Sequence, residues 1–159
     1  MRKEKKDMIE QNTTKRNHCT QSKIDNANKK INQEIYLRNR QAPIQIKIDD
    51  LSIFINDKIT RRGIAKGLVF VQEDLNKNIL EAEKYTLKVL MTDNLEEQYN
   101  YLMKVKLIMK VEIWTDIRFL MINKAITPGE ITELIRRQKE IDKDLDRWLA
   151  SIKKSYIRQ

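Results

Sequence analysis

Three groups of basic side chains have the type and spacing to bind the phosphates of an anionic partner. They are Arg61, Arg62 and Lys66; Arg136, Arg137 and Lys139; and Lys153, Lys154 and Arg158. The first group lies at the start of a predicted helix, where unpaired N–H groups and the helix dipole favour anions. Each group is also typical of a solvated helix surface, where charged side chains pair with neighbours three or four residues away. The last group has the fewest acidic neighbours, so it is the stronger phosphate candidate.

The sequence contains no recognisable catalytic constellation and no metal-binding motif. His18 and Cys19 are adjacent, but one histidine and one cysteine are too few for a metal site without carboxylates or further subunits. Asp142, Asp144 and Asp146 alternate around a predicted helix instead of converging, so they do not form an acid–base pair. We therefore expect a protein that is not an enzyme and that needs no cofactor and no metal.

Four amphipathic segments are predicted to position these side chains. Apolar residues recur every three or four positions over residues 50–60, 64–89, 95–123 and 127–156, which is the period of a helix with one apolar face. The last segment opens with a capping box, in which Thr127 is the N-cap, Pro128 the first helical residue and Glu130 the residue that reaches back. Short connections favour antiparallel neighbours, so the expected fold class is all-α, an antiparallel up-down four-helix bundle.

Two tryptophans and a leucine are expected to hold the helices, or their oligomer, together. Leu145 and Trp148 lie on the apolar face of the last segment, and this position favours a core or subunit-interface role over that of a binding anchor. Trp114 belongs to residues 95–123, whose apolar side chains extend well beyond one face. Such a helix is either central in the bundle or buries a second face against another subunit.

The first 42 residues form a basic arm that precedes a bundle domain at residues 43–159. The arm holds 11 basic and 5 acidic side chains and is rich in Asn, Gln and Thr, so we expect it to be largely disordered, with a weak helical pattern at residues 24–37. Ala42-Pro43 is expected to break the chain. Ile44, Ile46 and Ile48 then alternate, as in a short strand or an extended lead-in to the next helix.

Charge and composition narrow the class of protein. The net charge of +9 and its concentration in the arm indicate either an anionic partner, most often nucleic acid, or a solubilising tail. The single cysteine excludes an internal disulfide and favours a reducing compartment. No apolar run approaches the ~20 residues of a membrane span, and the charged N-terminus does not resemble a secretory signal. We expect a cytoplasmic protein with no membrane partner.

The last two helical segments resemble those of a known family. Ile126 and Thr127 precede the final helix, and Leu145, Trp148 and Ser151 mark its end. Over roughly residues 74–151 this pattern resembles the four-helix-bundle family of the accessory variability determinant (Avd) of diversity-generating retroelements and of proteins from ribosomal RNA intervening sequences. Two charged residues separate the leucine from the tryptophan, where the family usually has small ones. The resemblance implies a non-catalytic, basic homo-oligomer, a pentamer if Avd-like, that binds a reverse transcriptase and nucleic acid.

Three functions remain open from the sequence. The first is an Avd-like accessory protein that binds RNA or DNA together with a reverse transcriptase. The alternative is a ribbon-helix-helix-type DNA-binding regulator or plasmid mobilisation protein, which requires residues 44–48 to pair as a strand across a dimer. The third is a structural interaction module whose apolar segment at residues 95–123 meets another protein.

Overall fold

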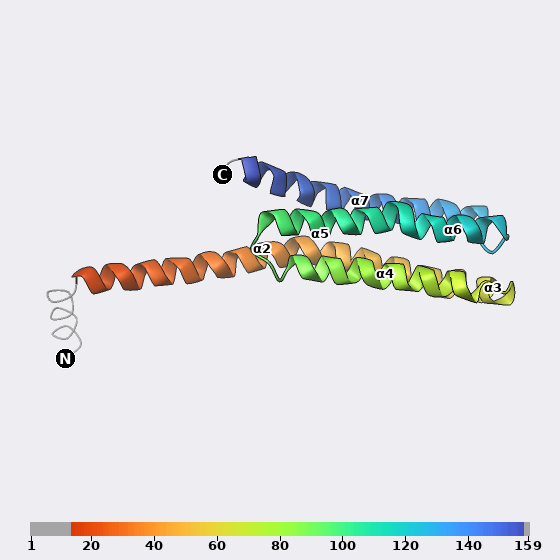
Figure 1. The fold of residues 1–159 in the computed structure, drawn as a ribbon, viewed down its shortest axis with the longest axis horizontal. Helices are drawn as coiled ribbons and strands as arrows, with labels where there is room; N and C mark the ends of the chain where they lie inside the picture. The colour runs from red at the N-terminus through yellow and green to blue at the C-terminus, as the bar shows by residue number, and fades with distance from the viewer. Residues whose placement is uncertain (1–13, 158–159) are drawn as a thin grey trace. The chain divides into compact units, whose positions relative to one another are not determined.

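The computed structural model describes residues 14–157, and all of its elements in that range are helical (Figure 1). In chain order they are α2 Thr14–Lys58, α3 Thr60–Ala65, α4 Val69–Val89, α5 Leu95–Leu107, the π-helical turn η1 Ile108–Glu112, α6 Ile113–Ile122 and α7 Pro128–Ile157. The predicted all-α fold class is confirmed. None of the described helices is both long enough and apolar enough to cross a membrane.

The chain divides into two compact units, residues 1–36 and residues 37–159. The first unit contains the beginning of α2, and its side chains from Thr20 onward are almost all exposed. The helix extends over the weak pattern predicted at residues 24–37. Residues 1–13 of the predicted basic arm lie outside the described residues, as do the side chains of His18 and Cys19.

Helix α2 continues through Pro43, so the predicted chain break at this residue is wrong. The strand interpretation of residues 44–48 is also wrong. Ile44 and Ile48 are fully buried and four residues apart, whereas Ile46 between them is 59% exposed, and this is the pattern of a helix face. Pro43 is exposed, so its missing N–H disturbs the helix at a site open to solvent. Burial of the isoleucines on the opposite face outweighs that local cost.

A residue in the left-handed region separates α3 from α4. Gly67 has a φ of 74°, a conformation that favours glycine. Helix α4 therefore begins at Val69 and not at residue 64, where the apolar periodicity had predicted a helix start. Gly63 on α3 is buried, and a Cβ added there would lie 3.5 Å from the side chain of Leu120 on α6. This is an ordinary van der Waals distance, so α3 packs against the Leu120 side chain at this position.

The start of α7 confirms the predicted capping box. The backbone N–H of Thr127 donates to the Glu130 carboxylate at 2.9 Å, and the N–H of Glu130 donates to the Thr127 hydroxyl at 3.2 Å. Lys124, in the connection from α6, has a φ of 57°. Helix α5 begins with a simpler cap, in which the Asn94 side chain accepts a hydrogen bond from the N–H of Glu97 at 3.1 Å.

The helices of the second unit pack around one apolar core. Helix α4 packs against α5 and α6, and α5 packs against α7 (Figure 1). The second half of α2 contacts α7 through Lys47 and Asp144, and it contacts α4 through Gln45 and Thr86. Helices α2, α4, α5, α6 and α7 contribute buried side chains, among them Ile48, Ile55, Leu75, Ile79, Leu102, Val105, Ile117, Leu120, Ile141 and Leu145.

Candidate nucleic-acid interface

Arg62 is engaged in an ion pair between helices. Its guanidinium donates to the carboxylate of Glu130 and to the backbone carbonyl of Lys58. The hydrogen bond from Arg62 is the main cause that holds the pKa of Glu130 below its ordinary value, and hydrogen bonds from Thr127 lower it further. The ion pair joins α3 to the first turn of α7. We therefore assign Arg62 a structural role, although the sequence placed it among the phosphate candidates.

Arg136 and Arg137 are also paired. Arg136 donates to Glu133 at 2.5 Å and to Glu140 at 2.8 Å. Arg137 donates to Glu133 at 2.9 Å, and its guanidinium carbon lies 4.9 Å from the centre of the Phe54 ring on α2. The hydrogen bond from Arg136 is the main cause that lowers the pKa of Glu133. Because carboxylates already balance both charges, these arginines are weaker phosphate candidates than the sequence indicated.

Five of the predicted cations are exposed and unpaired. Arg61, Lys66, Lys139, Lys153 and Lys154 have exposed side chains, and none of them forms an ion pair with another described residue. Arg158, the remaining candidate, lies outside the described residues. A cation that is not paired with a carboxylate of the same chain is available to an anionic partner, so these five residues are the better phosphate candidates.

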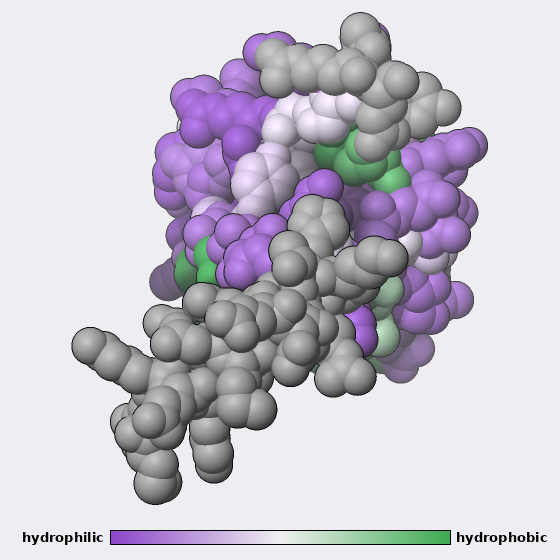
Figure 2. Space-filling model, turned by 90° about the vertical axis from the view of Figure 1, so that its left-hand side faces the viewer, coloured by the Kyte–Doolittle hydropathy of each residue, from purple (hydrophilic) through white to green (hydrophobic). Residues whose placement is uncertain are grey.

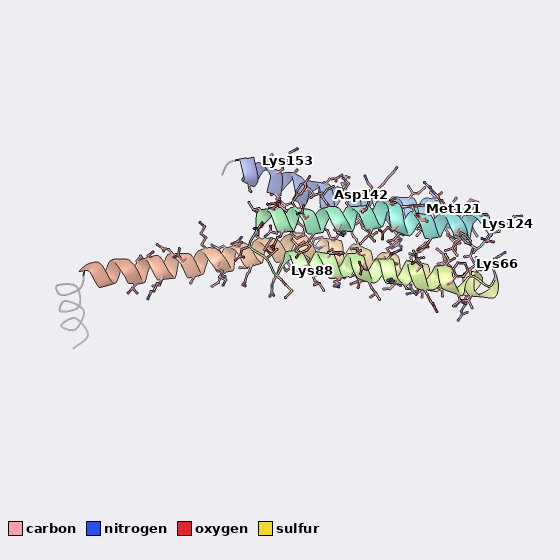
Figure 3. The ribbon with its side chains drawn as sticks, in the orientation of Figure 1. Lys66, Lys88, Met121, Lys124, Asp142 and Lys153 are labelled. Carbon is pink, nitrogen blue, oxygen red and sulfur yellow. The ribbon has the colours of Figure 1, made fainter. Side chains whose placement is uncertain are left out.

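Four of these unpaired cations lie at the two ends of the second unit. Figure 3 shows Lys66 and Lys124 at one end and Lys153 toward the other. The Arg62–Glu130 pair places α3 at the first turn of α7. Lys153 lies 23 residues after Glu130 on α7, which corresponds to about 35 Å at ~1.5 Å per residue. The first and the last of the three basic groups therefore do not share one surface.

A groove of about 310 Å³ lies beside Lys153, between the start of α5 and the end of α7. Its lining combines an aromatic ring, an ammonium, an amide and one carboxylate, from Leu95, Glu96, Tyr99, Asn100, Ile152 and Lys153. Among the coloured residues on the side of the molecule that Figure 2 shows, hydrophilic side chains predominate. An exposed aromatic ring beside a cation suits the base and the phosphate of a single strand of nucleic acid. We take this groove, with Lys154, as the best candidate interface.

The alternating aspartates of α7 pair with lysines of two neighbouring helices. The pairs are Lys47–Asp144 at 2.6 Å, Lys106–Asp146 at 2.5 Å and Lys110–Asp142 at 3.7 Å. Lys47 lies on α2, whereas the other two lysines lie on α5 and η1. The aspartates thus connect α7 to both neighbours.

The three predicted packing residues lie inside the second unit. Leu145 and Trp148 are fully buried on α7. Trp114 on α6 is half-buried, and its indole N–H donates to the side chain of Gln138 on α7 at 2.7 Å. These contacts give the three residues a role in packing within one chain.

A buried acidic group between α4 and α6 was missed in the sequence. Asp116 is 8% exposed, and the amide of Asn78 donates to Asp116 at 3.2 Å and to Asp74 at 3.3 Å. Burial, and then the neighbouring carboxyl group of Asp74, raise the pKa of Asp116 to about 7. No sequence signal connects Asp74 with Asp116, because the two are brought together only by the packing of α4 on α6. We assign this group a structural role.

The second apolar face predicted for residues 95–123 remains exposed. Six apolar residues of α5, η1 and α6 are 37–79% exposed, namely Tyr99, Met103, Leu107, Val111, Phe119 and Ile122, and we call this set the α5–α6 stripe. The ring of Phe70 on α4 packs edge-on against Phe119 with 5.9 Å between centroids. Exposed apolar side chains in this number favour a protein-binding role.

Comparison with known proteins identifies no relative of this chain. No family model, no curated protein and no solved structure matches the chain. Within residues 14–157, no cluster of three or more histidine, cysteine, aspartate or glutamate side chains is arranged to hold a metal ion. The interpretation of the site therefore depends on the geometry of this chain alone.

Proposed function

We propose that this chain is a non-catalytic accessory protein of the cytoplasm that binds nucleic acid. Its second unit serves as an antiparallel up-down four-helix bundle made of α2 from Leu37 onward, α4, α5 with η1 and α6, and α7. The bundle holds the side chains in position, and exposed cations contact the nucleic acid. The groove beside Lys153 and the adjacent Lys154 are the primary contact surface.

The main observation in favour of this proposal is that some basic side chains are paired with carboxylates of the same chain and others are not. Carboxylates within the protein balance Arg62, Arg136 and Arg137, whereas Lys153 and Lys154 have no such partner among the described residues. Unpaired cations beside an aromatic ring favour a ligand that offers both phosphates and stacking surfaces.

A protein partner is the second part of the proposal. The exposed α5–α6 stripe favours contact with another protein, and we propose that it serves homo-oligomer formation. The resemblance of residues 126–151 to the Avd family supports a reverse transcriptase of a diversity-generating retroelement as a further partner.

The ribbon-helix-helix alternative loses the observation that motivated it. That fold requires a strand at residues 44–48, and in the structure α2 covers this segment. Ile44 and Ile48 are buried in the core of the same chain, so they are not available to pair across a dimer.

Binding of the purified full chain to labelled single-stranded DNA and to a structured RNA tests the proposal. We expect binding at low salt that weakens steeply as the salt concentration rises, because each phosphate contact releases counterions. The absence of binding to both probes at low salt would contradict it.

A further inference from the structure

Two tyrosines and two lysines from α4 and α5 form a cluster that the basic groups of the sequence did not include. The rings of Tyr85 and Tyr101 lie 6.0 Å apart with 32° between their planes. The Lys88 ammonium lies 5.0 Å from the centre of the Tyr85 ring and 5.7 Å from that of Tyr101. The Lys104 ammonium approaches Tyr85 at 5.6 Å. Figure 3 shows Lys88 on α4.

The cluster concentrates positive charge without an internal counterion. Both ammonium groups lie over one ring, so they are within about 11 Å of each other, a distance over which like charges still repel. Among the described residues, no carboxylate forms an ion pair with Lys88 or Lys104, in contrast to the paired Lys47 and Lys106. Tyrosine rings attract the ammonium groups but do not neutralise them. An anion bound here would relieve the repulsion.

The donors of the cluster match a ligand with several anionic oxygens. The cluster contains two ammonium groups and two phenol O–H groups, and within the described part of the chain neither Tyr85 nor Tyr101 has a hydrogen-bond partner for its hydroxyl. Lys88 is half-buried and Lys104 is exposed, so an anion can reach both. Glu97 is the acidic residue of α5 closest in sequence to Tyr101. Its carboxylate accepts a hydrogen bond from the Thr92 hydroxyl at 2.6 Å.

We propose that Lys88, Lys104, Tyr85 and Tyr101 form a binding site for a run of consecutive phosphate groups. Two separated ammonium groups fit two phosphates of one chain better than a single small anion. The same chemistry occurs in a linear polyphosphate and in the backbone of a single-stranded nucleic acid. The polyphosphate source is independent of the proposed function, whereas the nucleic-acid source rests on it.

The test uses the full chain with two probes, tripolyphosphate and a labelled single-stranded oligonucleotide. We expect the double variant Lys88→Gln and Lys104→Gln to weaken binding about ten-fold or more, and to lower the salt slope for the oligonucleotide by about 1.4, at ~0.7 per phosphate. The variant Tyr101→Phe keeps the ring and should weaken binding about three-fold. The variant Lys84→Gln removes an exposed lysine of α4 outside the cluster and should leave binding unchanged. Thermal unfolding of each variant checks that the fold is retained.

The outcomes separate this inference from the proposed function. Loss of tripolyphosphate binding in the double variant, with no oligonucleotide binding by either protein, supports the site and contradicts the proposed function. Loss of binding to both probes supports the site and assigns it to nucleic acid as well. Unchanged binding of both probes by the double variant overturns the site and leaves the proposed function standing. Equal competition by polyglutamate against both probes also overturns the assignment to phosphate.

Discussion

The side chain of Gln138 connects the indole of Trp114 to the backbone of the π-helical turn. The indole N–H donates to the Gln138 oxygen at 2.7 Å, and the Gln138 amide donates to the carbonyl of Met109 at 3.2 Å. A π-helical turn shifts the hydrogen-bond register by one residue, so a carbonyl there can lack its usual partner. One polar side chain on α7 thus satisfies two polar groups on the facing helix.

Replacing Gln138 with leucine should destabilise the protein, although the new side chain is apolar and of similar size. The substitution leaves the indole N–H and the Met109 carbonyl without partners, at a cost of about 1–3 kcal/mol. Urea unfolding of the variant Gln138→Leu measures this loss. Lys139→Leu, at the exposed neighbouring position, serves as a control and should change the free energy of unfolding little. Equal stability of Gln138→Leu and the wild type would show that the bridge contributes nothing.

Asp116 should make the protein less stable as the pH rises. Its pKa is about 7 in the folded protein and about 3.9 in the unfolded chain, so the folded state holds the proton more tightly. The stabilisation is complete below pH ~4 and is lost as the pH rises through 7, with a slope of at most about 1.4 kcal/mol per pH unit. Asp116→Asn should flatten the decline between pH 4 and pH 7 in urea unfolding. The exposed control Asp93→Asn should retain it, and an unchanged slope in Asp116→Asn would assign the decline to another group.

The capping box should contribute measurably to stability. Thr127→Ala removes the hydroxyl that accepts the N–H of Glu130, and it should lower the free energy of unfolding by about 0.5–2 kcal/mol. Thr127→Ser keeps the hydroxyl and should stay close to the wild type. If both variants unfold at the same urea concentration as the wild type, the box is formed but contributes no stability.

The capping box and the apolar faces could be predicted because they depend on local sequence. Thr127 and Glu130 are three residues apart, and the interaction requires only a helix between them. The chain break predicted at Pro43 was wrong, because burial of Ile44 and Ile48 on the core side outweighs the local preference against a helix at this residue. A short alternation of isoleucines fits a strand, but it fits equally a helix that buries every fourth residue.

The candidate site was harder to predict, because pairing depends on residues far apart in the sequence. Arg62 and Glu130 are 68 residues apart and meet only when α3 packs beside α7. The pairs of Arg136 and Arg137 with Glu133 span three and four residues and follow the local pattern, but the partner of Arg62 could not be identified from the sequence. The cluster around Tyr85 and Tyr101 likewise forms only when α4 packs against α5.

The α5–α6 stripe should control assembly in solution. We expect the variant Leu107→Ser with Phe119→Ser to shift the wild-type oligomer to smaller species, because both side chains are about half exposed on one chain. Light scattering after size-exclusion chromatography measures the mass. Met91→Ser changes a more exposed apolar residue outside the stripe and should leave the mass unchanged. A monomeric wild type, or an oligomer of unchanged mass in the double variant, would rule the stripe out as the subunit interface.

We propose that the unpaired cations, and not the paired ones, bind nucleic acid. The direct measurement is the salt dependence of binding to a single-stranded oligonucleotide for two variants that each remove two positive charges. Lys153→Gln with Lys154→Gln should weaken binding and lower the salt slope by about 1.4, at ~0.7 per phosphate. Arg136→Gln with Arg137→Gln should leave affinity and slope close to the wild type. Equal losses in both variants would contradict the account, because binding would then follow net charge and not the position of the unpaired lysines.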